Sequence, residues 1–327
     1  MIDPTAYERP APRRDPPPPP AMRPGAIVAR RYRLCSRIGS GGMADVFAAI
    51  DLKTGREVAL KIIRVKSSAY GLGAVWREAA LARRVRHHNV CRTLDAGAEL
   101  VFDDGAPGRS FPFLVLELLE GETLRDRVQR DGPLPLESTI RLALQIAAGL
   151  SAIHQAHIIH RDIKSSNVLL IAGAAGDRAV IIDFGLALWR DGGGSRAVPT
   201  APDALTQAVP LCGTPAYMAP EQAMGLSANR SSDVYALGTV LYEMVTGRLP
   251  YPAESGRSIL YRKQKGARFP RPSALRRDLP VALDRIVCRC LAVRPSDRYH
   301  DATQVHRDLA DGWRERSADR WDLETAR

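Results

Sequence analysis

Three side chains of different chemistry lie close together in the stretch HRDIKSSN, residues 160–167. Asp162 can accept a proton from an alcohol, Lys164 can stabilise the charge of a phosphate, and Asn167 can offer an amide oxygen to a metal ion. A surface loop could carry this set by chance. A site that must accept a proton, bind a phosphate and hold a metal ion at once would require it, and the other motifs of the chain decide between these alternatives.

Three further motifs could serve the same chemistry. The glycine-rich stretch IGSGGMADVF, residues 38–47, lies between two predicted strands, where backbone N–H groups could approach phosphate oxygens. Lys61 lies in VALKII, whose period-two alternation places Lys61 and Ala59 on one face of a strand. The apolar run VIID ends at Asp183. Each motif alone has an ordinary structural explanation, namely a hairpin turn, a solvent-facing lysine or a turn aspartate.

Composition indicates a soluble globular protein, because 45% of the residues are hydrophobic and 25% are charged. We expect no membrane span, since no stretch of about 18 uncharged apolar residues occurs. The chain also begins without the apolar core of a signal peptide, so we expect a cytoplasmic location. The five cysteines include no CxxC pair and are expected to be reduced thiols.

The net charge of +11 raises the question of nucleic-acid binding. Residues 262–277 hold seven cations and no acid, yet a solvated basic face explains them better than a nucleic-acid site. The chain has 41 Arg and only six Lys, so a lysine at a given position requires a reason.

The sequence divides into a tail, two lobes and a second tail. Residues 1–30, rich in proline, are predicted to be a disordered tail, and residues 313–327 a C-terminal tail. Between them, residues 31–117 are strand-rich with one predicted helix, and residues 122–312 are mainly helical, with a hinge near 117–122. Helices are predicted over residues 71–85, 137–158, 231–247, 281–293 and 301–312, and Ser and Asp are expected to cap the third of these.

Taken in this order, the motifs make the chain resemble the protein kinase superfamily, and in particular the eukaryotic-like serine/threonine kinases of bacteria. The resemblance covers about residues 32–311 and rests on the glycine loop, the VAIK-type Lys61, HRD…N at 160–167, DFG at 183–185 and APE at 219–221. It implies an α+β, bilobal kinase fold with a small β-rich N-lobe containing one helix and a larger, mainly helical C-lobe. One such motif could arise by chance, whereas five in family order leave little room for accident.

The resemblance assigns catalytic roles to four residues. Phosphoryl transfer passes through a loose transition state, so the enzyme mainly positions groups and neutralises charge. Asp162 would accept the proton of the substrate hydroxyl, and Lys164 would stabilise the γ-phosphate. Lys61 would hold the α- and β-phosphates and pair with Glu78.

The family pattern also implies a metal site and a nucleotide site. Asn167 and Asp183 would ligate Mg²⁺, a hard cation that prefers oxygen ligands, with Mn²⁺ as an alternative. Leu116 matches the gatekeeper position. The residues that would bind ATP are Ile38, Gly39, Ser40, Gly41, Gly42, Met43, Ala44, Asp45, Val46, Ala59, Lys61, Glu117, Leu119 and Leu169.

One residue departs from the family pattern, and three others match structural positions. Ala44 stands where the family has the third glycine of the loop, and the turn is in question because alanine resists positive φ. Asp233 resembles the residue that holds the backbone of the catalytic loop, and Glu221 is expected to pair with Arg298.

The resemblance further implies phosphoregulation. Arg161, beside the expected base, would bind a phosphorylated activation loop. Thr206 matches the position most often phosphorylated in bacterial relatives, with Thr200 and Ser195 as lesser candidates. Thr214 matches a hydroxyl that bridges the catalytic Asp and Lys in serine/threonine kinases.

These observations favour an ATP-dependent kinase that acts on Ser/Thr hydroxyls of proteins and autophosphorylates in its activation loop. A pseudokinase that serves as an ATP-binding scaffold is the alternative, and a small-molecule phosphotransferase and a basic nucleic-acid binder are two others. The expected partners are ATP and protein substrates, without membrane or nucleic acid, and homodimerisation stays open.

Overall fold

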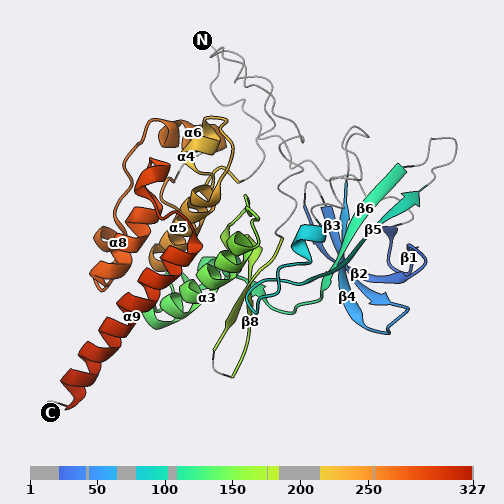
Figure 1. Ribbon diagram of the computed structural model, residues 1–327, viewed down its shortest axis with the longest axis horizontal. Helices are drawn as coiled ribbons and strands as arrows, with labels where there is room; N and C mark the ends of the chain where they lie inside the picture. The colour runs from blue at the N-terminus through green and yellow to red at the C-terminus, as the bar shows by residue number, and fades with distance from the viewer. Residues whose placement is uncertain are drawn as a thin grey trace, which may run out of the picture. The chain divides into compact units, whose positions relative to one another are not determined.

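The computed structural model describes residues 22–41, 44–64, 79–101, 109–174, 176–183, 214–252 and 255–325, with side chains at 100–110 and beyond 314 left out. These residues belong to two compact units (Figure 1). The first lies within Met1–Ser68 and Leu94–Leu118, and the second within Ala69–Thr93 and Leu119–Arg327. Several residues expected to act in the site lie outside the described residues, namely Gly42, Met43, Glu78, Thr200, Thr206 and Ser195.

The first unit is a six-stranded sheet with strand order β1-β2-β3-β4-β6-β5. Its strands are β1 (Ile27–Val28), β2 (Tyr32–Ser40), β3 (Ala44–Asp51), β4 (Glu57–Ile63), β5 (Thr93–Val101) and β6 (Arg109–Glu117). β2, β3, β4 and β6 pair antiparallel. The turn between β3 and β4 contains Gly55 at φ +71°, a left-handed conformation that glycine adopts without strain.

One face of this sheet carries the core of the unit. Val58, Leu60 and Ile62 of β4 pack there with Phe47 and Phe113, as the alternation in VALKII predicted. Lys61 is buried as well, at 5% exposure, but it belongs to the opposite face. The sequence pattern therefore separates a structural face from a face that can serve a ligand.

The second unit is mainly helical around a small sheet. The sheet contains β7 (Glu122–Thr123), β8 (Val168–Ile171) and β9 (Arg178–Ile181), in that order. Its helices are α2 (Leu124–Asp131), α3 (Leu136–Gln155), η2 (Ser165–Asn167), α4 (Pro220–Ala223), α5 (Arg230–Thr246), α6 (Gly256–Gln264), α7 (Pro272–Leu275), α8 (Val281–Cys290), η5 (Pro295–Asp297) and α9 (Ala302–Thr325). Of the helix predicted over 71–85, residues 79–82 are described and are helical.

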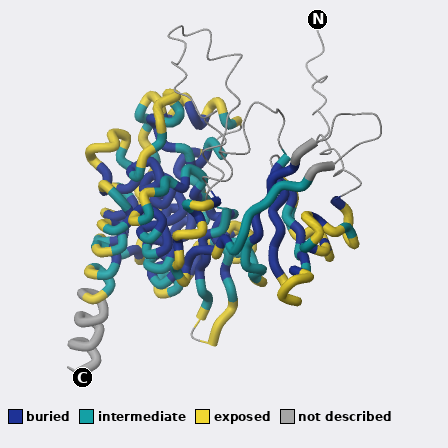
Figure 2. Tube along the Cα trace, turned by 45° about the vertical axis from the view of Figure 1, so that its right-hand side comes forward, coloured by how far each residue is buried: buried dark blue, intermediate teal, exposed yellow. Residues whose placement is uncertain are grey.

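Helices α3 and α5 contribute many of the buried residues of the second unit, whose interior is largely dark blue in Figure 2. α3 is long and apolar enough to cross a membrane by length and composition, yet its apolar residues lie in the core, where Ala143, Ile146 and Leu150 are fully buried. Its apolarity is therefore explained by packing.

The helix predicted over 231–247 is present as α5, shifted by one residue, but its predicted N-cap was wrong. Asn229, not the following Ser and Asp, is the N-cap, and its side chain accepts a hydrogen bond from the backbone N–H of Ser232. Asn is as favourable at the N-cap as Ser or Asp, and residues of all three types are close together here. The sequence alone therefore did not identify which of them is the N-cap. The helix ends at Gly247, which adopts the left-handed conformation with φ +68°, as predicted.

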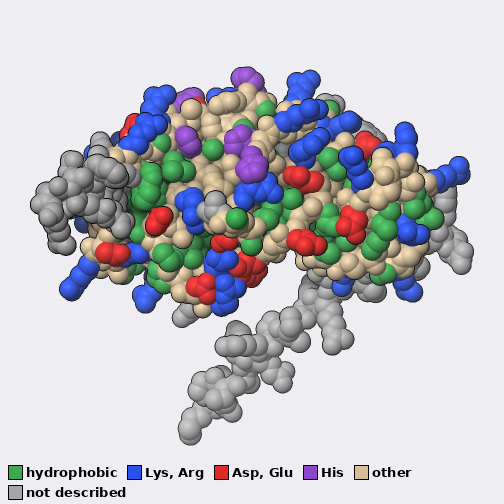
Figure 3. Space-filling model, turned by 90° about the horizontal axis from the view of Figure 1, so that it is seen from below, with side chains coloured by type: hydrophobic (Ala, Val, Ile, Leu, Met, Phe, Trp, Pro, Cys, Tyr) green, Lys and Arg blue, Asp and Glu red, His purple; other side chains and the backbone are tan. Residues whose placement is uncertain are grey.

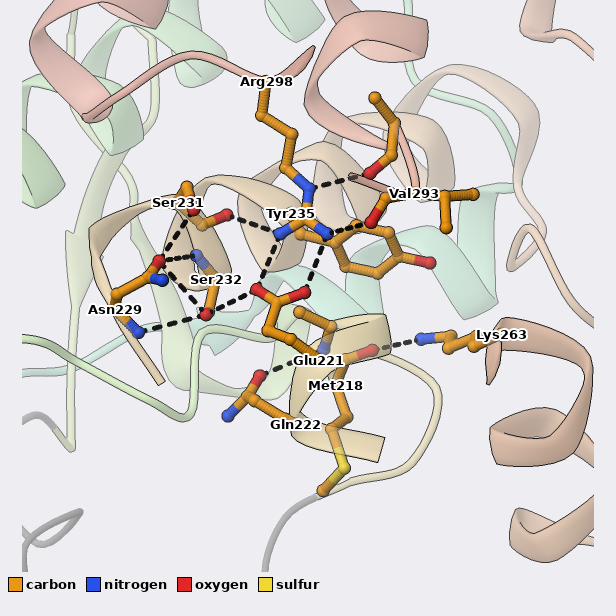
Figure 4. Close-up of polar contacts among 12 residues, drawn as sticks. Met218, Glu221, Gln222, Asn229, Ser231, Ser232, Tyr235, Lys263, Val293 and Arg298 are labelled. Atoms are coloured by element: carbon orange, nitrogen blue, oxygen red, sulfur yellow. Dashed lines mark hydrogen bonds and ion pairs between the residues drawn. The ribbon is translucent and has the colours of Figure 1, made fainter. Parts of the chain in front are cut away.

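A buried ion pair joins α4 to the segment after η5 (Figure 4). The two terminal nitrogens of Arg298 each lie 2.8 Å from an oxygen of Glu221, and the side chain of Arg298 is fully buried. Arg298 also donates to three backbone carbonyls, those of Ser231, Ala292 and Val293. This confirms the predicted pair and shows that one guanidinium connects three segments.

We expect Arg298→Met to lower the free energy of unfolding by about 3–5 kcal/mol, because it leaves the carboxylate of Glu221 buried without its counter-charge. Arg314→Met is the matched control, since Arg314 lies in an exposed ion pair with Asp311 and should shift stability by about 0.5 kcal/mol or less. Urea denaturation of both variants measures the difference, and equal losses would contradict this account.

Candidate active site

Asp162, Lys164 and Asn167 converge in the second unit as the sequence predicted. The Nζ atom of Lys164 lies 2.8 Å from Oδ2 of Asp162. The side-chain amide nitrogen of Asn167 donates to the backbone carbonyl of Asp162 at 2.9 Å and to Oδ2 at 3.2 Å. The side chains of Asp162 and Lys164 are 18% and 19% exposed, so a ligand can reach them.

The pairing of β8 with β9 brings Asp183 to the same place. Val168 faces Ile181 in the antiparallel register, so the preceding Asn167 and the following Ile182 meet at the strand ends. The N–H of Ile182 donates to the carbonyl of Asn167 at 2.9 Å, and Asp183 is the next residue. Asp183 has φ +64°, a conformation that costs a non-glycine residue roughly 1–2 kcal/mol and that marks functional sites.

A carboxylate on α5 holds the backbone of the loop. Asp233 accepts the N–H groups of His160 and Arg161, each at 2.7 Å, and the ring Nε2 of His154 lies 3.0 Å away. Asp233 is 1% exposed. Since Nδ1 of His154 accepts the N–H of Ala302, the ring carries its proton on Nε2 and donates it to Asp233.

The ring of His160 packs beneath the loop. The side chain is fully buried, and burial lowers the pKa of His160, so the imidazole is neutral near physiological pH. Its Nδ1 lies 3.3 Å from the N–H of Asp162 and accepts that bond. His160, two residues before the expected base Asp162, is thus a buried support of the loop.

A second hydrogen-bond chain links the loop to the segment at 214–219. The hydroxyl of Tyr217 donates to Oε2 of Glu243 at 2.5 Å and lies 2.8 Å from Oγ of Ser165. Burial raises the pKa of both Tyr217 and Glu243. Thr214 begins this segment, and its carbonyl accepts the N–H of Tyr217 at 3.0 Å.

In the first unit, Lys61 shares a sheet face with the residues expected near adenine. Its direct neighbours across the ladders are Val46 on β3 and Leu114 on β6, and Ala59 is opposite Leu116. All of these lie on the face opposite the core of the unit. A lysine on this face is surrounded by small and apolar side chains, as a site for an aromatic base and a phosphate would require.

The hairpin between β2 and β3 is fixed by an ion pair that the sequence did not predict. Arg64 donates to both oxygens of Asp45, at 2.9 and 2.8 Å, and Ser40 donates to Asp45 at 2.9 Å. The carboxylate of Asp45, expected at the nucleotide, is therefore engaged in holding the hairpin.

Ala44, which stands where the family has a glycine, is the first residue of β3 and does not have positive φ. Alanine therefore fits the backbone conformation at this position.

The other expected nucleotide contacts are divided between the units. Ile38, Gly39 and Glu117 are in the first, and Ile38 is 51% exposed. Leu119 and Leu169 are in the second. Leu169 is partly buried and faces away from the core that its neighbours on β8 enter.

The donor set around Asn167 and Asp183 fits a hard cation. The two hydrogen bonds that the Asn167 side chain donates to Asp162 use its amide nitrogen. The amide oxygen is therefore the atom that could face a metal ion. The described residues contain no group of three His, Cys, Asp or Glu side chains that could hold a metal alone. One carboxylate and one amide suit Mg²⁺, which takes its remaining ligands from water and phosphate.

Comparison with known proteins gives a family match over most of the chain. Residues 32–309 match the model of the protein kinase domain. A probable serine/threonine-protein kinase of Corynebacterium efficiens is 37% identical over 289 residues, which is 86% of this chain and 41% of that protein. Serine/threonine-protein kinase PknB of Mycobacterium tuberculosis is 34% identical over 285 residues, 86% of this chain and 43% of PknB. The chain thus spans about two fifths of the length of these relatives.

Solved structures show the same fold at lower identity. The kinase domain of Mycobacterium tuberculosis PknI, as a double mutant, superposes with a TM-score of 0.64 at 21% identity and covers 89% of this chain and 99% of its own. Rad53 residues 1–466, in complex with AMP-PNP, gives a TM-score of 0.66 at 23% identity and covers 85% of this chain and 65% of its own. The expected bilobal kinase fold is confirmed.

We expect Asp233→Asn to loosen the loop at 160–162, because an amide has one acceptor oxygen where the carboxylate has two. Amide hydrogen exchange at His160 and Arg161 should accelerate about 10-fold or more, and stability should fall by about 1–3 kcal/mol. Asp311→Asn, on the exposed face of α9, is the control and should change neither. Unchanged exchange at both amides would show that Asp233 does not hold the loop.

Proposed function

Because this chain belongs to the protein kinase family, among the serine/threonine-protein kinases of bacteria, we propose that it transfers the γ-phosphate of ATP to Ser/Thr hydroxyls of proteins. The observation that carries the proposal is the cluster of Asp162, Lys164 and Asn167, anchored from below by Asp233 and adjoining Asp183. An ATP-binding scaffold without transfer would have no need for this cluster.

In the proposed reaction, the hydroxyl oxygen of the acceptor forms a bond to the γ-phosphorus, and the bond from that phosphorus to the β,γ-bridging oxygen breaks. The acceptor proton passes to Asp162, and ADP carries the released electron pair. Lys164, 2.8 Å from Asp162, neutralises charge on the transferred phosphoryl group. Arg161 would bind phosphate on the activation loop.

The first unit supplies part of the nucleotide site in this proposal, and residues of the second unit supply the rest. Lys61 would bind the α- and β-phosphates and pair with Glu78, while Val46, Ala59 and Leu169 would enclose the adenine. Lys61 is poised for this because its ladder neighbours are apolar and it lies on the face away from the core. Ile38, Gly39, Ser40, Gly41 and Ala44 would provide the remaining contacts, together with the backbone of Glu117 and Leu119.

The proposed metal is Mg²⁺, with Mn²⁺ as an alternative, held by Asn167 and Asp183. The ion would neutralise phosphate charge when bound with the nucleotide. The chain's own contribution is to orient the two ligands through the bond between Ile182 and Asn167 and the left-handed conformation of Asp183.

The domain assignment is part of the proposal: a tail over residues 1–30, a kinase domain over 31–312 with its lobes at 31–117 and 122–312, and a tail over 313–327. The first boundary needs correction, because Ile27–Val28 form β1 of the first sheet and Met22 and Val28 are buried in its core, so residues 22–30 belong to the folded domain and not to a disordered tail. The boundary between the two compact units, at Leu118, supports a hinge near 117–122. We place this domain in the cytoplasm, where ATP and Mg²⁺ are available.

Nucleic-acid binding is the less supported alternative. On the face in Figure 3, Lys and Arg side chains are interspersed with Asp and Glu. Within the basic stretch at 262–277, Arg271 pairs with Asp284 at 2.6 Å and Arg276 with Asp278 at 2.9 Å. Part of the basic charge is thus neutralised within the chain.

We expect Asp162→Asn and Lys61→Met each to lower phosphotransfer by about 10²-fold or more, since the first removes the base and the second the phosphate-binding cation. Lys53→Met and Asp126→Asn, both exposed, are the matched controls and should keep activity. Incubation with labelled ATP, Mg²⁺ and a generic protein acceptor, followed by phosphoamino-acid analysis, measures transfer and identifies the acceptor type. Label on neither Ser nor Thr would reject the proposed function.

We also propose that the kinase phosphorylates its own activation loop, first at Thr206 and secondarily at Thr200 or Ser195. Mass spectrometry after incubation with Mg-ATP should find phosphate in residues 184–213 of the wild type and none in Asp162→Asn. Thr206→Ala should lose most of it. An active enzyme whose loop stays unmodified would refute the proposal.

A further inference from the structure

Lys263, in the last turn of α6, is buried with its charge directed at main-chain carbonyls. The residue is 1% exposed. Its Nζ donates to the carbonyls of Pro215, Ala216 and Met218, at 3.2, 2.6 and 2.7 Å. Figure 4 shows the bond to Met218, beside Glu221 and its ion pair. All three acceptors belong to the segment at 214–219 that precedes α4.

The residue type is informative in this chain. Lysine is rare here, with six Lys against 41 Arg, and the single Nζ atom of Lys263 donates to three carbonyls, whereas Arg298 reaches its three carbonyls through three different nitrogens. A compact ammonium has three donors that can diverge toward three carbonyls, whereas the planar fork of arginine cannot match this geometry. The identity of this residue is therefore a geometric requirement.

The position is costly for stability. The rings of Tyr235 and Tyr251 lie 4.9 and 5.8 Å from Nζ and give partial compensation. Burial, together with the charge of Arg298, nevertheless lowers the pKa of Lys263 to about 7. An apolar side chain of similar length could fill the same space without this cost. An apolar side chain could not, however, hold the carbonyls of Pro215, Ala216 and Met218 in fixed directions.

Two other contacts hold α6 against the same stretch. A Cβ on Gly256, at the start of the helix, would lie 2.8 Å from Cγ of Pro215, so the helix approaches the segment as closely as glycine permits. The side chain of Gln264 donates to the carbonyl of Ala223 at 2.5 Å. Contacts at both ends of α6 thus position residues 215–223.

The segment leads directly to the catalytic loop. Tyr217 lies between two residues bound by Lys263, and its hydroxyl contacts Ser165, which follows Lys164. The ammonium on α6 therefore sets the backbone from which Tyr217 reaches the loop that carries the expected base.

We propose that Lys263 is a positioning residue for the protein acceptor, holding the backbone at 215–218 in the shape against which the acceptor chain binds beside Asp162. This inference rests on the proposed function. It assigns to Lys263 an effect on acceptor binding that is separate from ATP binding, because neither the carbonyls that Lys263 binds at 215–218 nor the rings of Tyr235 and Tyr251 belong to residues expected to bind ATP.

Steady-state kinetics with a protein acceptor test the proposal. For Lys263→Met and Lys263→Arg, we expect the KM for the acceptor to rise about 10-fold or more while the KM for ATP changes less than about 2-fold. The Arg variant should fail to rescue the Met variant, since the charge alone is not the requirement. Lys265→Met, exposed at the end of the same helix, is the matched control and should behave as wild type.

The outcomes separate the two proposals. If wild type and Lys265→Met transfer phosphate but Lys263→Met keeps its acceptor KM, the positioning role is wrong and the kinase function stands. If wild type transfers none, both fall. Should Lys263→Met fail to fold, Gly256→Ala perturbs the same junction by displacing Pro215, and it should raise the acceptor KM selectively. Equal changes in both KM values would instead indicate a general structural effect and overturn the inference.

Discussion

The loop at 160–162 depends on hydrogen bonds to a side chain and not on the regular backbone bonds of a helix or sheet. The N–H groups of His160 and Arg161 are in irregular backbone, and Arg161 adopts φ +64°. Buried N–H groups without partners are costly, so the loop needs an acceptor from elsewhere. Asp233 provides it from α5, a helix buried along nearly its whole length. The site is therefore only as rigid as the packing of α5.

Other buried polar groups also connect α5 to neighbouring elements by hydrogen bonds. His154 ties Asp233 to α3 and to the start of α9, and the hydroxyl of Tyr217 ties Glu243 of α5 to Ser165. Partners of this kind add little net stability, because desolvation offsets most of the attraction. Their contribution is directional, since each requires one geometry, and a site that moves a proton needs its groups held closely.

The sequence predicted those parts of the site that show a periodic pattern of side chains or match a family motif. Alternation in VALKII separated Lys61 from Leu60, and the resemblance to the kinase family implied that Asp162, Asn167 and Asp183 lie in one region, which the pairing of β8 with β9 explains. It could not select Asn229 as the cap, because several cap residues are adjacent. It also missed the contact of Arg64 with Asp45, since side chains distant in sequence leave no periodic trace.

Lys263 shows that the low frequency of a residue type can be informative where the spacing of residues along the sequence is not. In the sequence it is one cation among seven in a basic stretch, and a solvated face was the natural interpretation. In the structure its neighbours Arg262 and Lys265 are exposed while it is buried against three carbonyls. The signal was the rarity of lysine in a chain that otherwise uses arginine, because a rare residue persists where the common one cannot satisfy the geometry. Rarity alone does not decide, because Lys53 and Lys265 are equally rare and are exposed, whereas Lys263 is buried. The rarity of lysine therefore marks candidate positions, and burial against oxygen atoms separates Lys263 from the solvated ones.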